Sequence, residues 1–303
     1  KFDELFVNAN SFNQAIGGWD TSSGTHMNDM FNGASSFNQA VNSWDTSSVT
    51  AMQNMFRSAT SFNQTCNSWN VGNVTNMSSM FQNCTAFNQD LNSWNTGSVT
   101  LLGSIFANCS SFNQNIGGWT TSSLTNTNMM FNGATSFNQD IDGWDMADVT
   151  NIATMFSGAT SFNQDLNSWN VGNVTTMSNT FKLATSFNGN ITSWDVSSVT
   201  TFNNMFSNAS SFNQNIGSWN TGSVTDTSFM LNACVAFNQN IGSWDLADVT
   251  RMDSMFQSCR AFNQNLNSWN TGNVTLMTDM FNGATIFNGN ITSWNTSSVT
   301  NMM

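Results

Sequence analysis

Residues 12–36 read FNQAIGGWDTSSGTHMNDMFNGASS, and Phe37 begins the same 25-residue pattern again. The pattern restarts every 25 residues without an insertion or a deletion, which gives eleven full copies over residues 12–286 and a partial copy over residues 287–303. A fixed period of this length is typical of solenoids and other repeat arrays. We therefore expect a single solenoid domain over residues 1–303, with residues 1–11 as a partial leading repeat, cut from a longer array.

The composition excludes several classes of protein. Only five residues are Lys or Arg against 17 Asp or Glu, for a net charge of -12. This acidic balance argues against nucleic acid, which is bound through clustered basic side chains, and against an anionic membrane surface. No apolar run approaches the length of a spanning helix. Aromatic residues at fixed intervals make up 13% of the chain, so we expect an ordered core despite the polarity.

Four positions of the repeat are the same in all twelve copies: Phe, Asn, Trp and Thr. Eight apolar positions per repeat are too few to offset the conformational entropy of ordering 25 residues. A lone repeat therefore cannot fold, and the copies must stack on one another. We expect these invariant residues to form ladders along the stack. In the first two copies they are Phe12, Asn13, Trp19, Thr25, Phe37, Asn38, Trp44 and Thr50.

Two polar positions differ in what they tolerate. The residue after Trp alternates between Asp45, Asn70 and, once, Thr120, so it requires a side-chain oxygen and not a charge. This interchange predicts an Asx turn. The Asn after Phe is never Asp, which predicts stacked carboxamides that use both their donor and their acceptor.

The apolar spacing within each repeat predicts a short helix and a short strand. Apolar residues at i, i+3, i+6, i+7 and i+10 from Val49 to Ala59 would share one face of a helix. The hydroxyl of Thr50 would cap the N-terminus of this helix. The extended piece would lie around Phe62 to Cys66.

The repeat MFxxAxxFNQxIxxWxTSxVTxM resembles the BspA-like bacterial surface protein repeat, a 25- to 26-residue relative of the leucine-rich repeat. It is carried here, for example, by Met55, Phe56, Ala59, Phe62 to Gln64, Trp69 and Val74 to Met77. The resemblance spans the whole chain and implies a leucine-rich-repeat-like solenoid in a surface or secreted protein. We expect about twelve right-handed coils, each with a short strand and a short helix. The family motif contains no catalytic residue.

Cysteine leaves two alternatives open. Cys84 and Cys109 occupy the same position in adjacent repeats, as do Cys234 and Cys259, while Cys66 stands alone in an aliphatic position. Adjacent coils about 4.8 Å apart are within reach of a disulfide. Alternatively, Cys replaces the small buried Ala of the other copies. No CxxC or Cys/His cluster indicates zinc.

Other chemical sites have weaker support. His26 is the only histidine, so a metal site would lack a second histidine ligand and a serine nucleophile would lack a base to activate it. Calcium at the Asp and Asn turns is disfavoured because Asn and Asp interchange there. The sequence contains many acceptor motifs for N-glycosylation, and those next to the expected turn are Asn73, Asn173 and Asn273.

From the sequence we expect a non-enzymatic, extracellular or cell-surface protein without a cofactor. It would be structural or adhesive, as a component of a filament, an appendage or a coat. Its partners would be other protein chains, including copies of itself end to end or side by side, and surface glycans. The alternative is a solenoid that binds glycan or ice through its Thr positions, although a structural role explains their invariance without a ligand.

Overall fold

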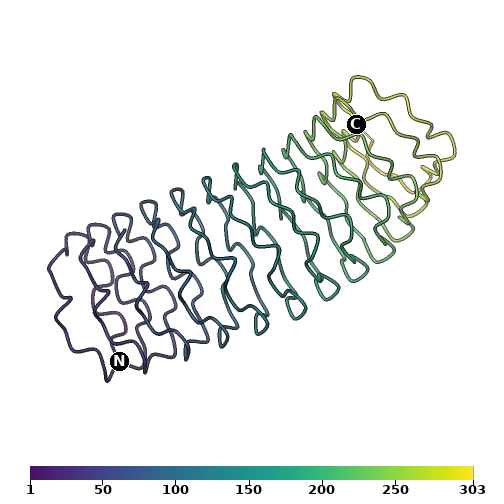
Figure 1. The fold of residues 1–303 in the computed structure, drawn as a ribbon. Helices are drawn as coiled ribbons and strands as arrows, with labels where there is room; N and C mark the ends of the chain where they lie inside the picture. Colours follow the sequence, from purple (N-terminus) through teal and green to yellow (C-terminus); the bar gives the residue numbers. More distant parts are fainter. Residues whose placement is uncertain (303) are drawn as a thin grey trace. The chain divides into compact units, whose positions relative to one another are not determined.

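The computed structural model describes residues 1–302 and divides into two compact units, Lys1–Val149 and Thr150–Met303. Within each unit, successive 25-residue coils lie side by side (Figure 1). Each unit is therefore a solenoid stack in which every coil repeats the path of the one before it. The single domain expected over residues 1–303 stays a prediction.

The described residues contain no helix and no extended strand. Isolated parallel β-bridges join the residues that follow the invariant Thr. In the first unit they are His26↔Ala51, Ala51↔Asn76, Asn76↔Leu101 and Leu101↔Asn126. In the second unit they are Asn151↔Thr176, Thr176↔Thr201, Thr201↔Asp226, Asp226↔Arg251, Arg251↔Leu276 and Leu276↔Asn301. One bridge per coil thus replaces the expected strand at a different place in the repeat.

The segment predicted to be a helix is a ribbon of consecutive turns. The N–H groups of Asn54 and Phe56 donate to carbonyls of the next coil, those of Ser78 and Met80, at 3.0 and 2.9 Å. The N–H of Met55, between them, donates to the carbonyl of Met52, three residues earlier, at 3.3 Å, and the N–H of Arg57 donates to that of Asn54 at 3.0 Å. Alternate N–H groups therefore hold the next coil, and the others close turns within the same coil.

Two positions in this ribbon have a left-handed backbone. Asn54 has a φ of 56° and Ser58 a φ of 59°, and the equivalent residues of other coils repeat these values. Such backbone dihedral angles interrupt an α-helix, and they favour Gly, Asn and Asp. The predicted helix is therefore wrong, and so is the helix cap assigned to Thr50. The apolar side chains from Val49 to Ala59 still point inward, because the ribbon of turns buries the same positions that a helix would have buried.

The segment from Phe62 to Cys66 is also not a strand in the structure. Phe62, Gln64 and Cys66 were expected to share one side; Phe62 and Cys66 are fully buried, but Gln64 is only half-buried. Gln64, between them, turns toward the preceding coil and donates from Nε2 to Oδ1 of Asn38 at 3.0 Å. A side-chain bond thus occupies the place where a ladder of backbone bonds would make a strand.

Aromatic rings fill the core. Phe56 stacks on Phe62 of its own coil, with ring centroids 3.9 Å apart, and on Phe81 of the next coil at 5.7 Å. Trp44 and Trp69 lie 6.2 Å apart with an angle of 4° between their planes. Large apolar surface is therefore buried between coils as well as within them, which explains why a single coil has no core of its own.

One buried position was missed from the sequence. Thr46 is 2% exposed, and its hydroxyl donates to the carbonyl of Asn70 in the next coil at 3.0 Å. Other coils place Val71 or Met146 at the same position, also buried. The exchange of Thr for Val, Leu and Met was the available signal of an inward side chain.

Candidate binding surface

The polar residues that recur in every coil hydrogen-bond to neighbouring coils. Oδ1 of Asn13 accepts from the backbone N–H of Asn38 and from Nε2 of Gln39, both at 3.0 Å. Oδ1 of Asn38 accepts in the same way from the N–H of Asn63 at 3.0 Å. The ladder thus runs from side chain to backbone. The sequence led us to expect that the Asn carboxamides would bond to one another, and in these coils they do not.

The invariant Thr residues form a second file along each stack. Both the N–H and the hydroxyl of Thr50 donate to the carbonyl of Thr25, at 2.9 and 3.2 Å. Thr75 and Thr100 repeat the pattern: the N–H of Thr100 donates to Thr75 at 2.9 Å and its hydroxyl at 3.1 Å. Nearly all these side chains are exposed, but nine of the twelve donate their hydroxyl proton to the carbonyl of the preceding Thr.

The predicted Asx turn is confirmed. Oδ1 of Asp20 accepts from the N–H of Ser22 at 3.0 Å and from its hydroxyl at 2.6 Å. These hydrogen bonds lower the pKa of the Asp20 carboxyl below its usual value, and the bond from the hydroxyl has the larger effect. The amide of Asn70 makes the equivalent bond to the N–H of Gly72 at 3.0 Å. An uncharged oxygen therefore closes the turn as well as a carboxylate does.

All five cysteines are free thiols buried in the core. Sγ of Cys84 donates to the carbonyl of Phe56, and Sγ of Cys109 to that of Phe81, each at 2.8 Å. Cys234 and Cys259 make the same bonds. The disulfides considered from the sequence are thus not formed, because each thiol points to the preceding coil's carbonyl. Burial raises the pKa of every one of these thiols.

The three glycosylation candidates Asn73, Asn173 and Asn273 are exposed beside the Asx turn. Nδ2 of Asn73 donates to the carbonyl of Ser47 at 2.8 Å, and Nδ2 of Asn273 to that of Ala247 at 2.7 Å. Glycosylation at these nitrogens stays a prediction.

Variation between coils is concentrated at exposed or half-buried positions. The residue after the invariant Thr includes basic, acidic, amide and aliphatic side chains, such as His26, Asn76, Asp226, Arg251 and Leu276. All of these lie on the line of β-bridges. Each unit therefore carries one column whose chemistry changes from coil to coil over a backbone that does not change.

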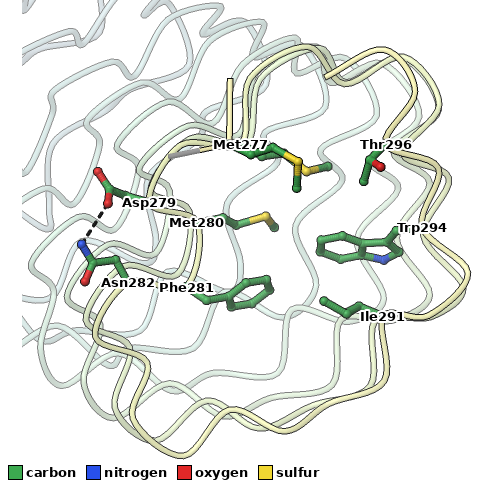
Figure 2. A pocket seen from close by; sticks show the side chains of 9 residues that line it. Met277, Asp279, Met280, Phe281, Asn282, Ile291, Trp294 and Thr296 are labelled. Carbon is green, nitrogen blue, oxygen red and sulfur yellow. Dashed lines mark hydrogen bonds between the residues drawn. The ribbon is translucent and has the colours of Figure 1, made fainter. Parts of the chain in front are cut away.

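The last described coil leaves part of its apolar side uncovered. Met280, Phe281, Ile291 and Trp294 line a hollow of about 540 Å³, and their side chains are drawn in Figure 2. At its rim, Nδ2 of Asn282 donates to the Asp279 carboxylate at 2.9 Å. In the coils before it, the same positions are covered by the next coil. The hollow thus has the chemistry of an interface between coils.

A second hollow, of about 600 Å³, lies on the side of the second unit. It runs from Asn240 and Ser243 of one coil to Asn265 and Ser268 of the next. Among residues 1–302, no group of three or more His, Cys, Asp or Glu side chains could hold a metal ion. The same residues contain no helix able to cross a membrane.

These features define a tandem-repeat solenoid whose invariant polar residues serve the stack. The chain belongs to the family described as "Mycoplasma protein of unknown function, DUF285", whose model matches residues 1–93, 80–188, 163–254 and 214–303. Among curated proteins, no sequence matches this chain.

Several solved leucine-rich proteins are similar in structure. A leucine rich cell surface protein from Faecalibacterium prausnitzii is 14% identical, with a TM-score of 0.40, over 84% of this chain and 77% of that one. A leucine-rich repeat protein from Bacteroides ovatus is 10% identical, with a TM-score of 0.28, over 80% and 72% of the two chains. The functional domain of InlJ from Listeria monocytogenes is 9% identical, with a TM-score of 0.25, over 83% and 59%. At these identities and TM-scores the likenesses carry no argument about function.

Proposed function

We propose that this protein is a non-enzymatic, extracellular or cell-surface repeat protein that binds other protein chains, including copies of itself. The observation that carries the proposal is that invariant and variable positions of the repeat have different roles. The invariant Asn and Thr residues take part in intercoil hydrogen bonds, whereas residues that vary from coil to coil occupy the bridge column, which is half-buried except at the exposed Arg251. A surface that varies over a fixed scaffold suits recognition or assembly and gives no reaction centre.

The surface location is supported by the resemblance to BspA-like repeats, which occur in surface and secreted proteins. The low content of charged residues, 7%, with a net charge of -12, is consistent with a coat or filament protein that does not bind nucleic acid. Labelling of intact source cells with an antibody against the purified protein tests the location. Labelling only after permeabilisation would contradict it.

Self-assembly is supported by the way in which the coils of this repeat bind one another. Within each unit, coils bind one another by stacking aromatic rings, as in the pair Trp269 and Trp294 at 6.0 Å. A coil presented by another copy has the matching rings and would extend the stack. In this arrangement the copies meet end to end, and they would form a filament or a coat.

Analytical ultracentrifugation over a concentration series, with electron microscopy of the same samples, tests assembly. We expect oligomers that grow with concentration. Ile291→Glu places a charge in the hollow and should abolish them, whereas Ile286→Glu is the matched control because that side chain is 55% exposed and does not line the hollow. Monodisperse monomers of the unaltered chain at every concentration would contradict end-to-end assembly.

A further inference from the structure

Successive coils are held together by hydrogen bonds that run along the stack. In the turn ribbon, alternate N–H groups donate to carbonyls of the next coil at 2.7–3.1 Å; in one coil the donors are Met52, Asn54, Phe56 and Ser58. Elsewhere in the same coil, the N–H of Thr75 donates to the carbonyl of Thr50 at 3.1 Å. Nε1 of Trp69 donates to the carbonyl of Val41 at 3.0 Å. A coil is thus bonded to its neighbours at several points around its circumference.

Within one coil, by contrast, the backbone bonds are local. In the part of the chain that the structure describes, those that do not join adjacent coils span two or three residues, as from the N–H of Ala59 to the carbonyl of Phe56 at 2.9 Å. Such bonds close single turns and do not tie the distant parts of a coil to one another. A coil that is separated from the stack therefore keeps no fold of its own.

Tension between the two ends of a unit acts along the same direction as the intercoil bonds. The force is applied where the chain enters and leaves the stack, so it reaches a terminal coil before the coils behind it. The bonds of that coil then open one after another, whereas a force across the stack would load many bonds together. Because stability in a repeat array is a sum over coils and their nearest-neighbour contacts, the coils behind it keep their own interfaces. Coils should thus separate singly.

A separated coil releases its full chain length. All five cysteines are free thiols, so none of them links one coil to the next. Each repeat has 25 residues, which extend to about 80–90 Å at about 3.3–3.6 Å per residue. In the stack the same residues occupy about 4.8 Å of length. Each coil therefore holds a reserve of length that is the same from coil to coil.

We propose that each unit is an extensible element, which lengthens under tension by losing coils one at a time and shortens again when the tension falls. The coil that returns finds its partners in place, because the remaining stack presents the carbonyls and rings that it left, as Phe81 is presented to Phe56. The proposal goes beyond the proposed function, because it concerns a single chain and can hold or fail independently of self-assembly and of a surface location.

Optical tweezers test this with the full chain tethered by its two termini. We expect repeated extensions of about 80 Å in contour length, which is the length of one coil less its thickness in the stack. Contractions of the same size should follow when the tension is lowered. A single extension that releases a whole unit at once would overturn the proposal, and so would steps whose length bears no relation to 25 residues.

A change in the length of one coil sharpens the test. Ser47 and Ser48 are both exposed, in the turn that follows Trp44. An insertion of about ten Gly and Ser residues between them should lengthen one step by about 33–36 Å and leave the others as they are. The same residues added at the end of the chain are the control and should change no step. An insertion that lengthens no step or every step, in a chain folded by circular dichroism, would count against separation coil by coil.

Discussion

The left-handed positions of the turn ribbon lead to a stability prediction at Thr154. This residue has a φ of 62°, although it is β-branched and such residues rarely adopt that conformation. The left-handed backbone destabilises an ordinary L-residue by roughly 1–2 kcal/mol, and glycine avoids this cost. Glycine in turn loses more conformational entropy on folding, which destabilises the folded state by about 0.5–1 kcal/mol. The Thr154 N–H donates to the carbonyl of Ser178, a bond that glycine keeps. We therefore expect Thr154→Gly to stabilise the second unit by about 0.5–1 kcal/mol.

The assay is thermal unfolding followed by circular dichroism. For a unit of this size, the gain corresponds to a rise in Tm of about 1–4 °C. Ala153→Gly is the control, because Ala153 precedes Thr154 in the same coil and does not have a positive φ. It should lower stability by about 0.5–1 kcal/mol, since glycine brings only its entropy cost. Equal destabilisation by both substitutions would refute the reasoning that backbone strain is concentrated at Thr154.

Three further outcomes test the ladders, the turns and the thiols. Asn88→Ala removes the acceptor of the Asn113 N–H, a bond of 2.9 Å, and should cost about 1 kcal/mol in a denaturant titration; Asn88→Asp, which keeps the acceptor, should cost less. The lowered pKa of Asp20 means that its turn is stabilised above the ordinary carboxyl pKa and that this contribution is lost as the pH falls through the lower folded value. Asp20→Asn should therefore unfold with a slightly smaller acid dependence than the unaltered chain, and an identical pH profile would contradict this. Because burial raises the thiol pKa values, all five cysteines should resist a thiol reagent until the chain is unfolded in guanidinium and then react together.

The repeat register and most inward positions could be predicted from the sequence. A 25-residue period fixes which residues share a column, and burial follows from the alternation of apolar and polar columns. The Asx turn was also predictable, because Asp45 and Asn70 share an oxygen and not a charge, and both make the expected bond. Columns within one chain thus give information that a single non-repeating sequence would not.

The prediction of a helix was wrong because apolar spacing alone does not distinguish a helix from a ribbon of turns. Both bury the positions between Val49 and Ala59. The signal that separates them was present in another column, where Gly33, Asn83 and Asn108 occupy a left-handed position. A helix disfavours Gly and Asn in its interior, whereas a left-handed turn favours them.

The bonding of the Asn ladder depends on information that the sequence does not hold. The absence of Asp from the ladder suggested that both halves of the carboxamide are used, yet the contact from Asn13 to Asn38 uses the acceptor alone.

Repetition separates stability from recognition in this fold. Every coil repeats the same intercoil bonds, so an altered exposed residue such as Arg251 leaves the ribbon and the aromatic stack unchanged. Recognition in a protein of this kind should therefore be sought where a coil departs from its neighbours, and not in the polar residues that all coils share.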